Sequence, residues 1–445
     1  MTKIQVHTFG CKVNSYDSGL LETQFKDFKG ADSLSSNLQS AARQIHVINS
    51  CAVTAEASRE AKKLAVKIKA KDPTATVVVT GCAAQVDKEL FSDAPAIDLV
   101  VANSHKGQLS QLIASYLRGE SEQKVYHSNI FKKDDLEAGG GLEPGHTRSF
   151  LKIQDGCNSF CSFCVIPYAR GKSRSIPVAD LLTQINFLVD KGIKELVLTG
   201  VHIGDYHDEV NNSSLEDLVE SILLKTKVYR IRLTSLEPIE LSPRLLEMYS
   251  DSRLCPHFHL SIQSASSKVL RDMKRKYDQH AVIDTLEAIH QRFPQAFVGM
   301  DVIAGFPTET HEDFMETHEV LARTPWTRLH VFPYSERKGT KAASLPESVE
   351  MAERKQRAWM LRNLSWHRYQ QQIQSQVGSI KKVLILNQPS KGAEGISRDF
   401  WNIKLSSDVS GYRGREILVK VNQIWKVDSQ RMDGVLAADV LEGAV

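Results

Sequence analysis

A chain of 445 residues is too long for one ordinary hydrophobic core, so we expect two or three domains. It is 42% hydrophobic and 24% charged, which excludes a chain disordered throughout. The net charge of +3 permits a nucleic-acid partner without requiring one, because a whole-chain sum can hide a local basic face. No segment reaches ~18 consecutive apolar residues, and the start "MTKIQVHTFG" has no apolar signal region, so we expect a cytoplasmic protein without a membrane span.

The first third of the chain alternates strand and helix patterns. Strands are predicted in "KIQVHTF", "IHVINS", "TATVVVTG" and "IDLVVAN", and helices in "YDSGLLETQFKDF" and "EASREAKKLAVKIKA". Strands separated by helices indicate a parallel α/β domain with right-handed crossovers, which we assign to residues 1–118. Residues 119–147 are polar, Gly-rich and aperiodic, and are predicted to form a linker.

A longer alternation follows in residues 148–376. Six apolar, β-rich runs, separated by helical stretches, are "SFLKIQ", "ELVLTG", "YRIRLTS", "FHLSIQ", "FVGMDVIAGF" and "RLHVFPYS". They predict a curved parallel sheet, an open or complete (β/α) barrel, closed by the long charged helix "VEMAERKQRAWMLRNLSWHRYQQQIQ". Residues 377–445 instead show short alternating strands, such as "KKVLILN" and "REILVKVN". This pattern predicts a small all-β barrel of the size of an oligonucleotide-binding module.

Seven cysteines in a chain of this length favour metal binding or catalysis in a reducing compartment over disulfides. Cys11, Cys51 and Cys82 each follow a predicted strand of the first domain, in "TFGC", "INSC" and "VTGC". Loops after parallel strands gather at one edge of the sheet, so these three thiols can meet in space. The alternative is three buried cysteines at strand ends. Three thiolates in one crevice favour an iron–sulfur cluster with one open iron.

The second group of cysteines lies in "DGCNSFCSFCVIPYARG", directly after the first predicted strand of the barrel. Cys157, Cys161 and Cys164 are too few to close a four-thiolate metal site, and they leave one coordination position open. The alternative is a structural zinc site completed by a distant ligand such as His202 or Cys255. Cys255 itself, in "RLCPHF", is otherwise expected to be a plain structural residue.

The spacing of Cys157, Cys161 and Cys164, with Phe163 before the last cysteine, resembles the radical S-adenosylmethionine superfamily. The resemblance implies a [4Fe–4S] cluster whose open iron is chelated by the methionine part of S-adenosylmethionine, and reductive cleavage that yields a 5′-deoxyadenosyl radical. It also implies residues that contact S-adenosylmethionine around the barrel mouth. Besides Phe163, those residues are Thr199 and Gly200 in "LTGVHIGD", Glu237 in "TSLEP", and Ser261 and Gln263 in "LSIQS". The alternative for each is an ordinary polar residue at a strand end.

The three-domain order narrows the resemblance to the methylthiotransferases, over nearly the whole chain. The similar motifs are "TFGCKVN", "NSCAVT", "GCNSFCSFCVIPYARGKSRS", "SIQSASSKVLRDMKRKY", "DVIAGFPTET" and "FPYSERKGT". Members insert sulfur and a methyl group into an unactivated C–H bond of threonylcarbamoyladenosine in tRNA, of isopentenyladenosine in tRNA, or of a ribosomal-protein aspartate. "GCKVN" resembles the threonylcarbamoyl branch most. The segment "FWNIKL" departs from the usual pattern of the terminal TRAM domain.

The resemblance implies two [4Fe–4S] clusters, one per cysteine trio, facing a shared cavity, with S-adenosylmethionine as radical source and methyl donor. It further implies an electron donor such as flavodoxin or ferredoxin and the anticodon stem-loop of tRNA as substrate; we expect a monomer. Arg170, Lys172 and Arg174 follow the cluster loop and are predicted to hold RNA phosphates. The basic run Arg271, Lys274, Arg275 and Lys276 is a further candidate, although such runs are often solvated faces. A non-catalytic RNA-binding protein with structural metal sites is the rival of another class.

Overall fold

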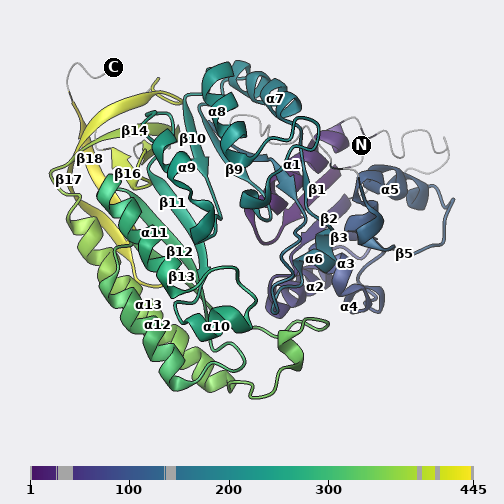
Figure 1. The fold of residues 1–445 in the computed structure, drawn as a ribbon. Coiled ribbons are helices and arrows are strands. Elements are labelled where there is room, and N and C mark those ends of the chain that lie inside the picture. The colour runs from purple at the N-terminus through teal and green to yellow at the C-terminus, as the bar shows by residue number, and fades with distance from the viewer. Residues whose placement is uncertain are drawn as a thin grey trace.

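Five parallel strands in sequence order form the first sheet of the computed structural model (Figure 1), which describes residues 3–26, 28, 44–134, 136, 147–387, 393–405 and 411–441. The strands are β1 (Lys3–Thr8), β2 (Gln44–Ser50), β3 (Thr76–Gly81), β4 (Leu99–Ala102) and β5 (Val125–Tyr126). The helices between them are α1 (Lys12–Lys26), α2 (Ala55–Lys71), α3 (Cys82–Val86), α4 (Lys88–Ser92) and α5 (Leu109–Leu117). The predicted parallel α/β domain is confirmed.

Two details of this domain differ from the sequence prediction. Helix α1 begins four residues earlier than its hydrophobic pattern indicates, at Lys12, so its first turn directly follows Cys11. The segment 119–147 is not aperiodic throughout, because β5 pairs with β4 and a short 3₁₀ helix covers Ile130–Lys132. Residues 135 and 137–146 of that predicted linker lie outside the described residues.

The central unit is a partial barrel of six parallel strands. They form two three-stranded sheets, joined where Leu236 bridges Leu260 and Ile231 bridges Leu254. The strands are β6 (Arg148–Lys152), β9 (Glu195–Thr199), β10 (Arg230–Leu233), β11 (His257–Gln263), β12 (Phe297–Ala304) and β13 (Arg328–Pro333), all at predicted positions. A two-stranded ribbon, β7 (Gln154–Asp155) with β8 (Arg174–Ser175), frames the cluster loop.

Helices cover the outer face of the barrel (Figure 1). They are α7 (Val178–Asp190), α8 (Leu215–Lys225), α9 (Pro243–Met248), α10 (Ser267–Asp272), α11 (Gln279–Arg292), α12 (His311–Arg323) and α13 (Met351–Gln374), whereas the short helix α6 (Ile166–Arg170) packs against α3 of the amino-terminal domain. Apolar residues from strands and helices fill one continuous core, with fully buried Leu196, Leu260 and Met300 at its centre. Over the described part of the chain, no helix is both long enough and apolar enough to cross a membrane.

The last unit is a closed five-stranded barrel in the order β14-β15-β16-β18-β17, with β17 pairing back to β14. Its strands are β14 (Ile380–Asn387), β15 (Glu394–Ser397), β16 (Asn402–Leu405), β17 (Glu416–Asp428) and β18 (Asp433–Val440). The small all-β barrel predicted from the sequence is confirmed. Strand β15 was not predicted, because its sequence Glu-Gly-Ile-Ser contains one large apolar residue and therefore no alternating pattern.

Buried arginines join this barrel to the central unit. Glu195 is fully buried and pairs with Arg230 at 2.7 Å and with Arg232 at 3.0 Å. Both guanidiniums also donate to the main-chain carbonyl of Ser397 in β15, at 3.0 and 2.8 Å. Burial alone would raise the pKa of Glu195, but the surrounding arginines lower it to about 2. The carboxylate therefore stays charged and holds two cations that clamp the terminal barrel.

We expect Glu195→Gln to lower the free energy of unfolding by about 3 kcal/mol, because it removes the ion pair of the buried Arg232 and leaves the buried Arg230 with Glu416 alone. Urea denaturation of the full chain measures the change. The control is Glu220→Gln, which breaks the ion pair with Arg244, whose two side chains are 52% and 49% exposed. That substitution should cost less than about 1 kcal/mol. Equal effects of the two variants would contradict the clamp.

Candidate active site

The first cysteine trio lies at one edge of the amino-terminal sheet. Cys51 and Cys82 directly follow β2 and β3, and Cys11 lies three residues beyond the end of β1. Because the strands are parallel, their carboxyl ends meet at the same edge. All three cysteines line one cavity of about 680 Å³. The sequence argument from strand ends therefore places these residues correctly in space.

Glycines keep space beside these thiols. Gly10 has φ +94°, and a Cβ there would lie 2.5 Å from the sulfur of Cys51. A side chain at Gly81, also at φ +94°, would meet the Ser50 carbonyl at 2.4 Å. Both positions need a residue without a Cβ, in a conformation that favours glycine. The backbone therefore packs closely against one side of Cys51, and the open space beside its sulfur is the cavity.

Burial makes two of these thiols poor anions on their own. It raises the pKa of Cys51 to about 12, with the neighbouring Cys82 adding to the rise. Burial also raises the pKa of Cys82, although Arg170 opposes it. A thiolate is the form that ligates metal, and a bound cation would compensate the cost of forming it at these two residues. With the exposed Cys11 as the third member, the thiols around this open space fit an iron–sulfur cluster held by three protein ligands.

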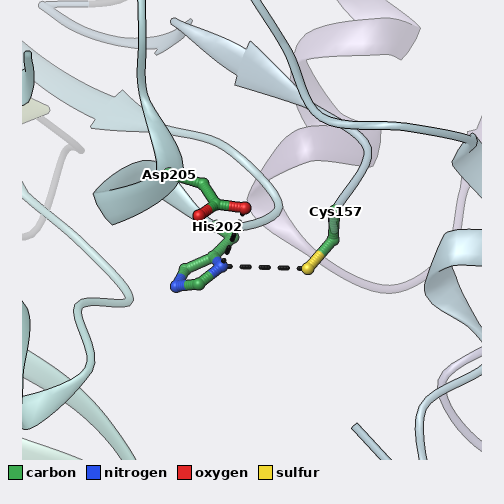
Figure 2. A group of neighbouring side chains, drawn as sticks. All are labelled: Cys157, His202 and Asp205. Carbon is green, nitrogen blue, oxygen red and sulfur yellow. Dashed lines mark hydrogen bonds and ion pairs between the residues drawn. The ribbon is translucent and has the colours of Figure 1, made fainter. Parts of the chain in front are cut away.

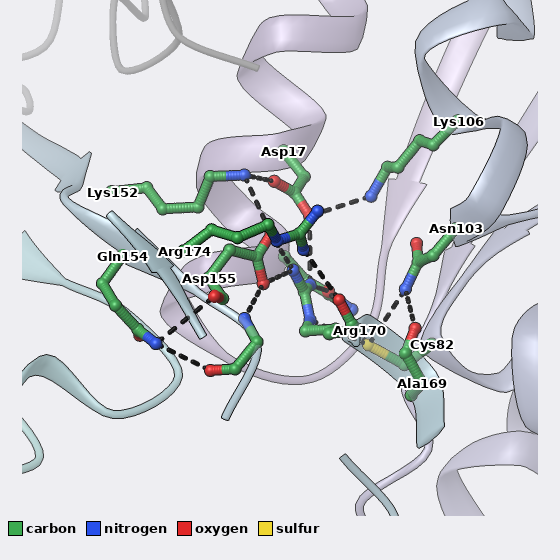
Figure 3. A network of polar contacts seen from close by, with 12 residues as sticks. Asp17, Cys82, Asn103, Lys106, Lys152, Gln154, Asp155, Ala169, Arg170 and Arg174 are labelled. Carbon is green, nitrogen blue, oxygen red and sulfur yellow. Dashed lines mark hydrogen bonds and ion pairs between the residues drawn. The ribbon is translucent and has the colours of Figure 1, made fainter. Parts of the chain in front are cut away.

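Arg170 connects the first trio to the barrel (Figure 3). Its Nε donates to the sulfur of Cys82 at 3.1 Å, and its Nη2 donates to the side chains of Asn14 at 2.6 Å and Asp17 at 3.0 Å. Its Nη1 donates to Asp155 in β7 of the barrel, at 2.9 Å. One guanidinium therefore bonds to helix α1, to a cysteine of the first trio and to the segment that leads to the second trio.

Two lysines complete this buried network. Lys106 donates to Asp17 at 2.9 Å, and Lys152 pairs with Asp17 at 2.8 Å and with Asp155 at 3.3 Å. Despite burial, these cations lower the pKa values of Asp17 and Asp155 well below the usual range. Three cations contact two carboxylates, so an uncompensated positive charge lies beside Cys82 (Figure 3).

The prediction that Arg170 holds an RNA phosphate is therefore wrong. Its side chain is 3% exposed and bonded to protein groups on every nitrogen. The basic stretch "YARGKSRS" divides into different environments, since Lys172 is exposed and Arg174 is half-buried. Arg174 donates to the main-chain carbonyl of Arg170 at 2.7 Å and to that of Lys133 at 3.2 Å. Of the three, only Lys172 lies openly at the surface.

The second trio follows β7 in a loop held against the barrel. Gly156, at φ +75°, passes so close to Lys172 that a Cβ would lie 1.9 Å from its carbonyl oxygen. Cys157 and Cys161 are buried and Cys164 is partly exposed. Burial raises the pKa of Cys164 to about 12. These three thiols would hold a cationic centre, but none of them lines the cavity of the first trio, so the expectation that both trios face that cavity is met by the first trio alone.

A second arginine touches this trio. The Nη1 of Arg275 donates to the sulfur of Cys161 at 3.0 Å, and its Nη2 lies 3.0 Å from Glu237 and 3.1 Å from the carbonyl of Ser261. The interpretation of Arg275 as part of an RNA-facing basic run is therefore wrong. Arg271, Lys274 and Lys276 of that run are exposed. Each cysteine trio thus has one carboxylate-held arginine that donates to a sulfur.

His202 completes the wall next to Cys157 (Figure 2). Its Nδ1 lies 3.8 Å from the sulfur of Cys157 and 3.5 Å from Asp205, while its Nε2 lies 2.5 Å from Glu240. Burial would lower the pKa of His202, but hydrogen bonds to Asp205, Cys157 and Glu240 raise it to about 12. A protonated imidazole is not a metal ligand. A bound metal would displace that proton, and Cys157, His202 and Asp205 offer ligand atoms within 4.8 Å of one another, so the zinc alternative is decided by which metal the purified chain holds.

The residues predicted to contact S-adenosylmethionine lie in different surroundings. Thr199, Gly200 and Ser261 line the same cavity as the first cysteine trio. Glu237 is buried between Arg275 and His202, which lies 3.4 Å away. The other two residues are Gln263, half-buried at φ +60°, and Phe163, which packs edge-on against Phe306. Cys255 is fully buried and belongs to neither trio.

Sequence reasoning missed several residues of this site. Asp17, Asn14 and Asp155 hold Arg170, and nothing in the segment of Asn14 and Asp17 marks these two as partners. Lys12 and Asp301 also line the cavity, from the start of α1 and from β12. The available signal for Lys12 was its position directly after Cys11, and for Asp155 its position just before the cluster loop.

Comparisons with known proteins agree with this geometry. Residues 151–321 match the family described as "Radical SAM superfamily", and residues 3–102 match "Uncharacterized protein family UPF0004". A solved radical S-adenosylmethionine methyltransferase, TsrM from Kitasatospora setae, superimposes with a TM-score of 0.51 at 13% identity, over 74% of this chain and 67% of that chain. The superposition supports the fold.

Curated relatives are similar over most of the chain. The threonylcarbamoyladenosine tRNA methylthiotransferase MtaB of Aquifex aeolicus is 36% identical over 87% of this chain and 93% of its own. The protein of the same name from Bacillus subtilis is 35% identical over 82% and 80%. The tRNA-2-methylthio-N(6)-dimethylallyladenosine synthase of Fusobacterium nucleatum is 31% identical over 95% and 98%. Taken with two cysteine trios on parallel sheets, these similarities show that the chain belongs to the radical S-adenosylmethionine methylthiotransferases that modify tRNA.

Proposed function

We propose that the protein methylthiolates C2 of N6-threonylcarbamoyladenosine at position 37 of tRNA, using two [4Fe–4S] clusters and S-adenosylmethionine. The observation that carries the proposal is the shared cavity. Cys11, Cys51 and Cys82 line it from the amino-terminal domain, and Thr199, Gly200 and Ser261 line it from the barrel. A substrate carbon in this cavity would be close both to a sulfur held by the first trio and to S-adenosylmethionine at the barrel mouth.

The donor sets support a cluster at each trio. Cys11, Cys51 and Cys82 would hold one, and Cys157, Cys161 and Cys164 the other, each leaving one iron open. Together with S-adenosylmethionine, the bound clusters would supply a carbon radical, the sulfur and the methyl group. A radical is required because the C2–H bond of adenine is not acidic enough for a general base to open.

The protein groups around the clusters have separate tasks. Arg170 and Arg275 donate to Cys82 and Cys161, and such hydrogen bonds stabilise electron density on ligand sulfur. Thr199 and Ser261 offer polar groups toward S-adenosylmethionine within the cavity. A protein electron donor such as flavodoxin or ferredoxin would supply the reducing equivalent. Lys172, exposed beside the cluster loop, would contact an RNA phosphate.

The names of similar proteins favour the threonylcarbamoyl branch over the alternatives. Five relatives between 32% and 36% identity carry the threonylcarbamoyladenosine name, and three between 28% and 31% carry the dimethylallyladenosine name. Isopentenyladenosine in tRNA and a ribosomal-protein aspartate are the alternative substrates.

Loss of the gene should remove 2-methylthio-N6-threonylcarbamoyladenosine from total tRNA and leave its unmethylthiolated precursor in its place. Mass spectrometry of tRNA nucleosides from a deletion strain measures both. Complementation with the intact gene is the control. Retention of the methylthio nucleoside, or loss of the isopentenyl counterpart instead, would contradict the proposed substrate.

Anaerobic reconstitution of the purified chain should give about eight iron and eight sulfide per chain, from two [4Fe–4S] clusters. Replacing Cys11, Cys51 and Cys82 together by Ala should leave about four iron, and so should replacing Cys157, Cys161 and Cys164. The matched control is Cys255→Ala, a buried cysteine outside both trios, which should keep the full count. Zinc in place of iron would instead favour a non-catalytic protein with structural metal sites.

Arg170 and Lys172 should separate cluster retention from RNA binding. Arg170→Lys should speed the loss of iron to a chelator, down to about four per chain, because the sulfur contact and its carboxylate bonds cannot all be kept. Lys172→Gln should keep its iron and reduce the salt slope of tRNA binding by about one. Iron release and filter binding at several salt concentrations measure the two effects. An exchange of the two phenotypes would contradict the buried placement of Arg170.

A further inference from the structure

The cavity has a polar wall that the cysteines and the strand-end residues do not explain. Lys12 enters it from the start of α1, and Asp301, His259 and His330 enter it from β12, β11 and β13. The Nε2 of His259 donates to Asp301 at 3.2 Å, and the rings of His259 and His330 lie edge to face at 5.7 Å. This wall faces the space in which the substrate base would lie.

Lys12 is the unusual member of the wall. It directly follows Cys11, and the charges that act on it belong largely to the barrel, with Asp301 attracting and Arg148 and Arg232 repelling. Within the described ranges, the ammonium of Lys12 forms no ion pair with a carboxylate. Asp301, the carboxylate that attracts it, is paired with His259. A cation held away from bulk water without a counter-ion is costly, and this cost is recovered when an anion binds.

The two candidate tRNA substrates, threonylcarbamoyladenosine and isopentenyladenosine, differ in the group on N6 that they would bring near Lys12. In adenine, C2 and the N6 substituent lie on the same edge of the ring, on either side of N1. If C2 faces the first cysteine trio, the N6 arm lies beside the residue that follows Cys11. A threonylcarbamoyl arm ends in a carboxylate, whereas an isopentenyl arm is a hydrocarbon that would leave the ammonium of the half-buried Lys12 without a carboxylate partner.

We infer that Lys12 is the specificity-determining residue for the N6 arm, pairing its ammonium with the carboxylate of the threonylcarbamoyl group. The inference rests on the proposed function and names the part of the substrate that is recognised. Asp301, which lines the same cavity and is held by His259, attracts the ammonium of Lys12. An uncharged arm gains nothing from this arrangement, so discrimination comes from the charge of the arm.

The test uses anticodon stem-loops of one sequence with three nucleosides at position 37: threonylcarbamoyladenosine, its methyl ester and isopentenyladenosine. Their affinities for the reconstituted protein, without S-adenosylmethionine, are measured by fluorescence anisotropy at one salt concentration. We expect the free acid to bind at least about tenfold more tightly than the ester. Lys12→Gln should abolish that ratio, and Lys12→Arg should keep most of it. The control is Lys67→Gln, on the exposed face of α2.

Equal binding of acid and ester by the unmodified protein overturns the inference without any variant. It is also overturned if Lys12→Gln keeps its iron content and still prefers the acid. These outcomes are independent of the nucleoside analysis of the deletion strain. Loss of the methylthio-threonylcarbamoyl nucleoside there, together with equal binding of acid and ester, would leave the proposed function standing and this inference rejected.

Discussion

The guanidinium of Arg170 is bonded at once to helix α1, to the sulfur of Cys82 and to Asp155 at the entrance of the cluster loop. An arginine suits this position because its planar fork of donors reaches several acceptors in fixed directions. Removing it would leave Asp17 and Asp155 buried with fewer counter-ions, a change that costs far more than the loss of an exposed pair. Together with the Lys152–Asp17 and Arg337–Asp87 ion pairs, this contact joins the amino-terminal domain to the barrel beside the cavity that the first trio lines.

The contact between Arg170 and Cys82 also explains why a network of buried cations lies beside thiols that would ligate metal. A cluster held by three thiolates brings negative charge into a buried place, and an excess of buried cations lowers the cost of that charge. Arg275 and Glu237 repeat the arrangement at the barrel trio, with Cys161 as the acceptor. Two unrelated segments thus reach the same solution, an arginine fixed by a carboxylate and aimed at one sulfur. A hydrophobic replacement of similar volume would fill the space but would leave the charge of the cluster without compensation.

Much of the fold could be predicted from the sequence, because buried parallel strands appear there as short apolar runs between helical patterns. The positions of Cys11, Cys51 and Cys82 followed from the same reasoning, since strand ends in a parallel sheet share an edge. The environments of Arg170 and Arg275 could not be predicted. A basic residue in a loop has the same local pattern whether it meets phosphate or a buried carboxylate, and Asp17 lies 153 residues away from Arg170. Tertiary contacts of this range leave no local periodicity.

Phe400 belongs to the turn between β15 and β16 of the terminal barrel, yet its ring lines the reaction chamber. The Phe400 ring stacks on His257 with ring centroids 3.8 Å apart. The guanidinium of Arg232 lies over the same ring, 5.1 Å from its centre. The terminal barrel therefore supplies part of the wall of this cavity, so a change in the turn between β15 and β16 alters the space that Cys11, Cys51 and Cys82 line from another domain.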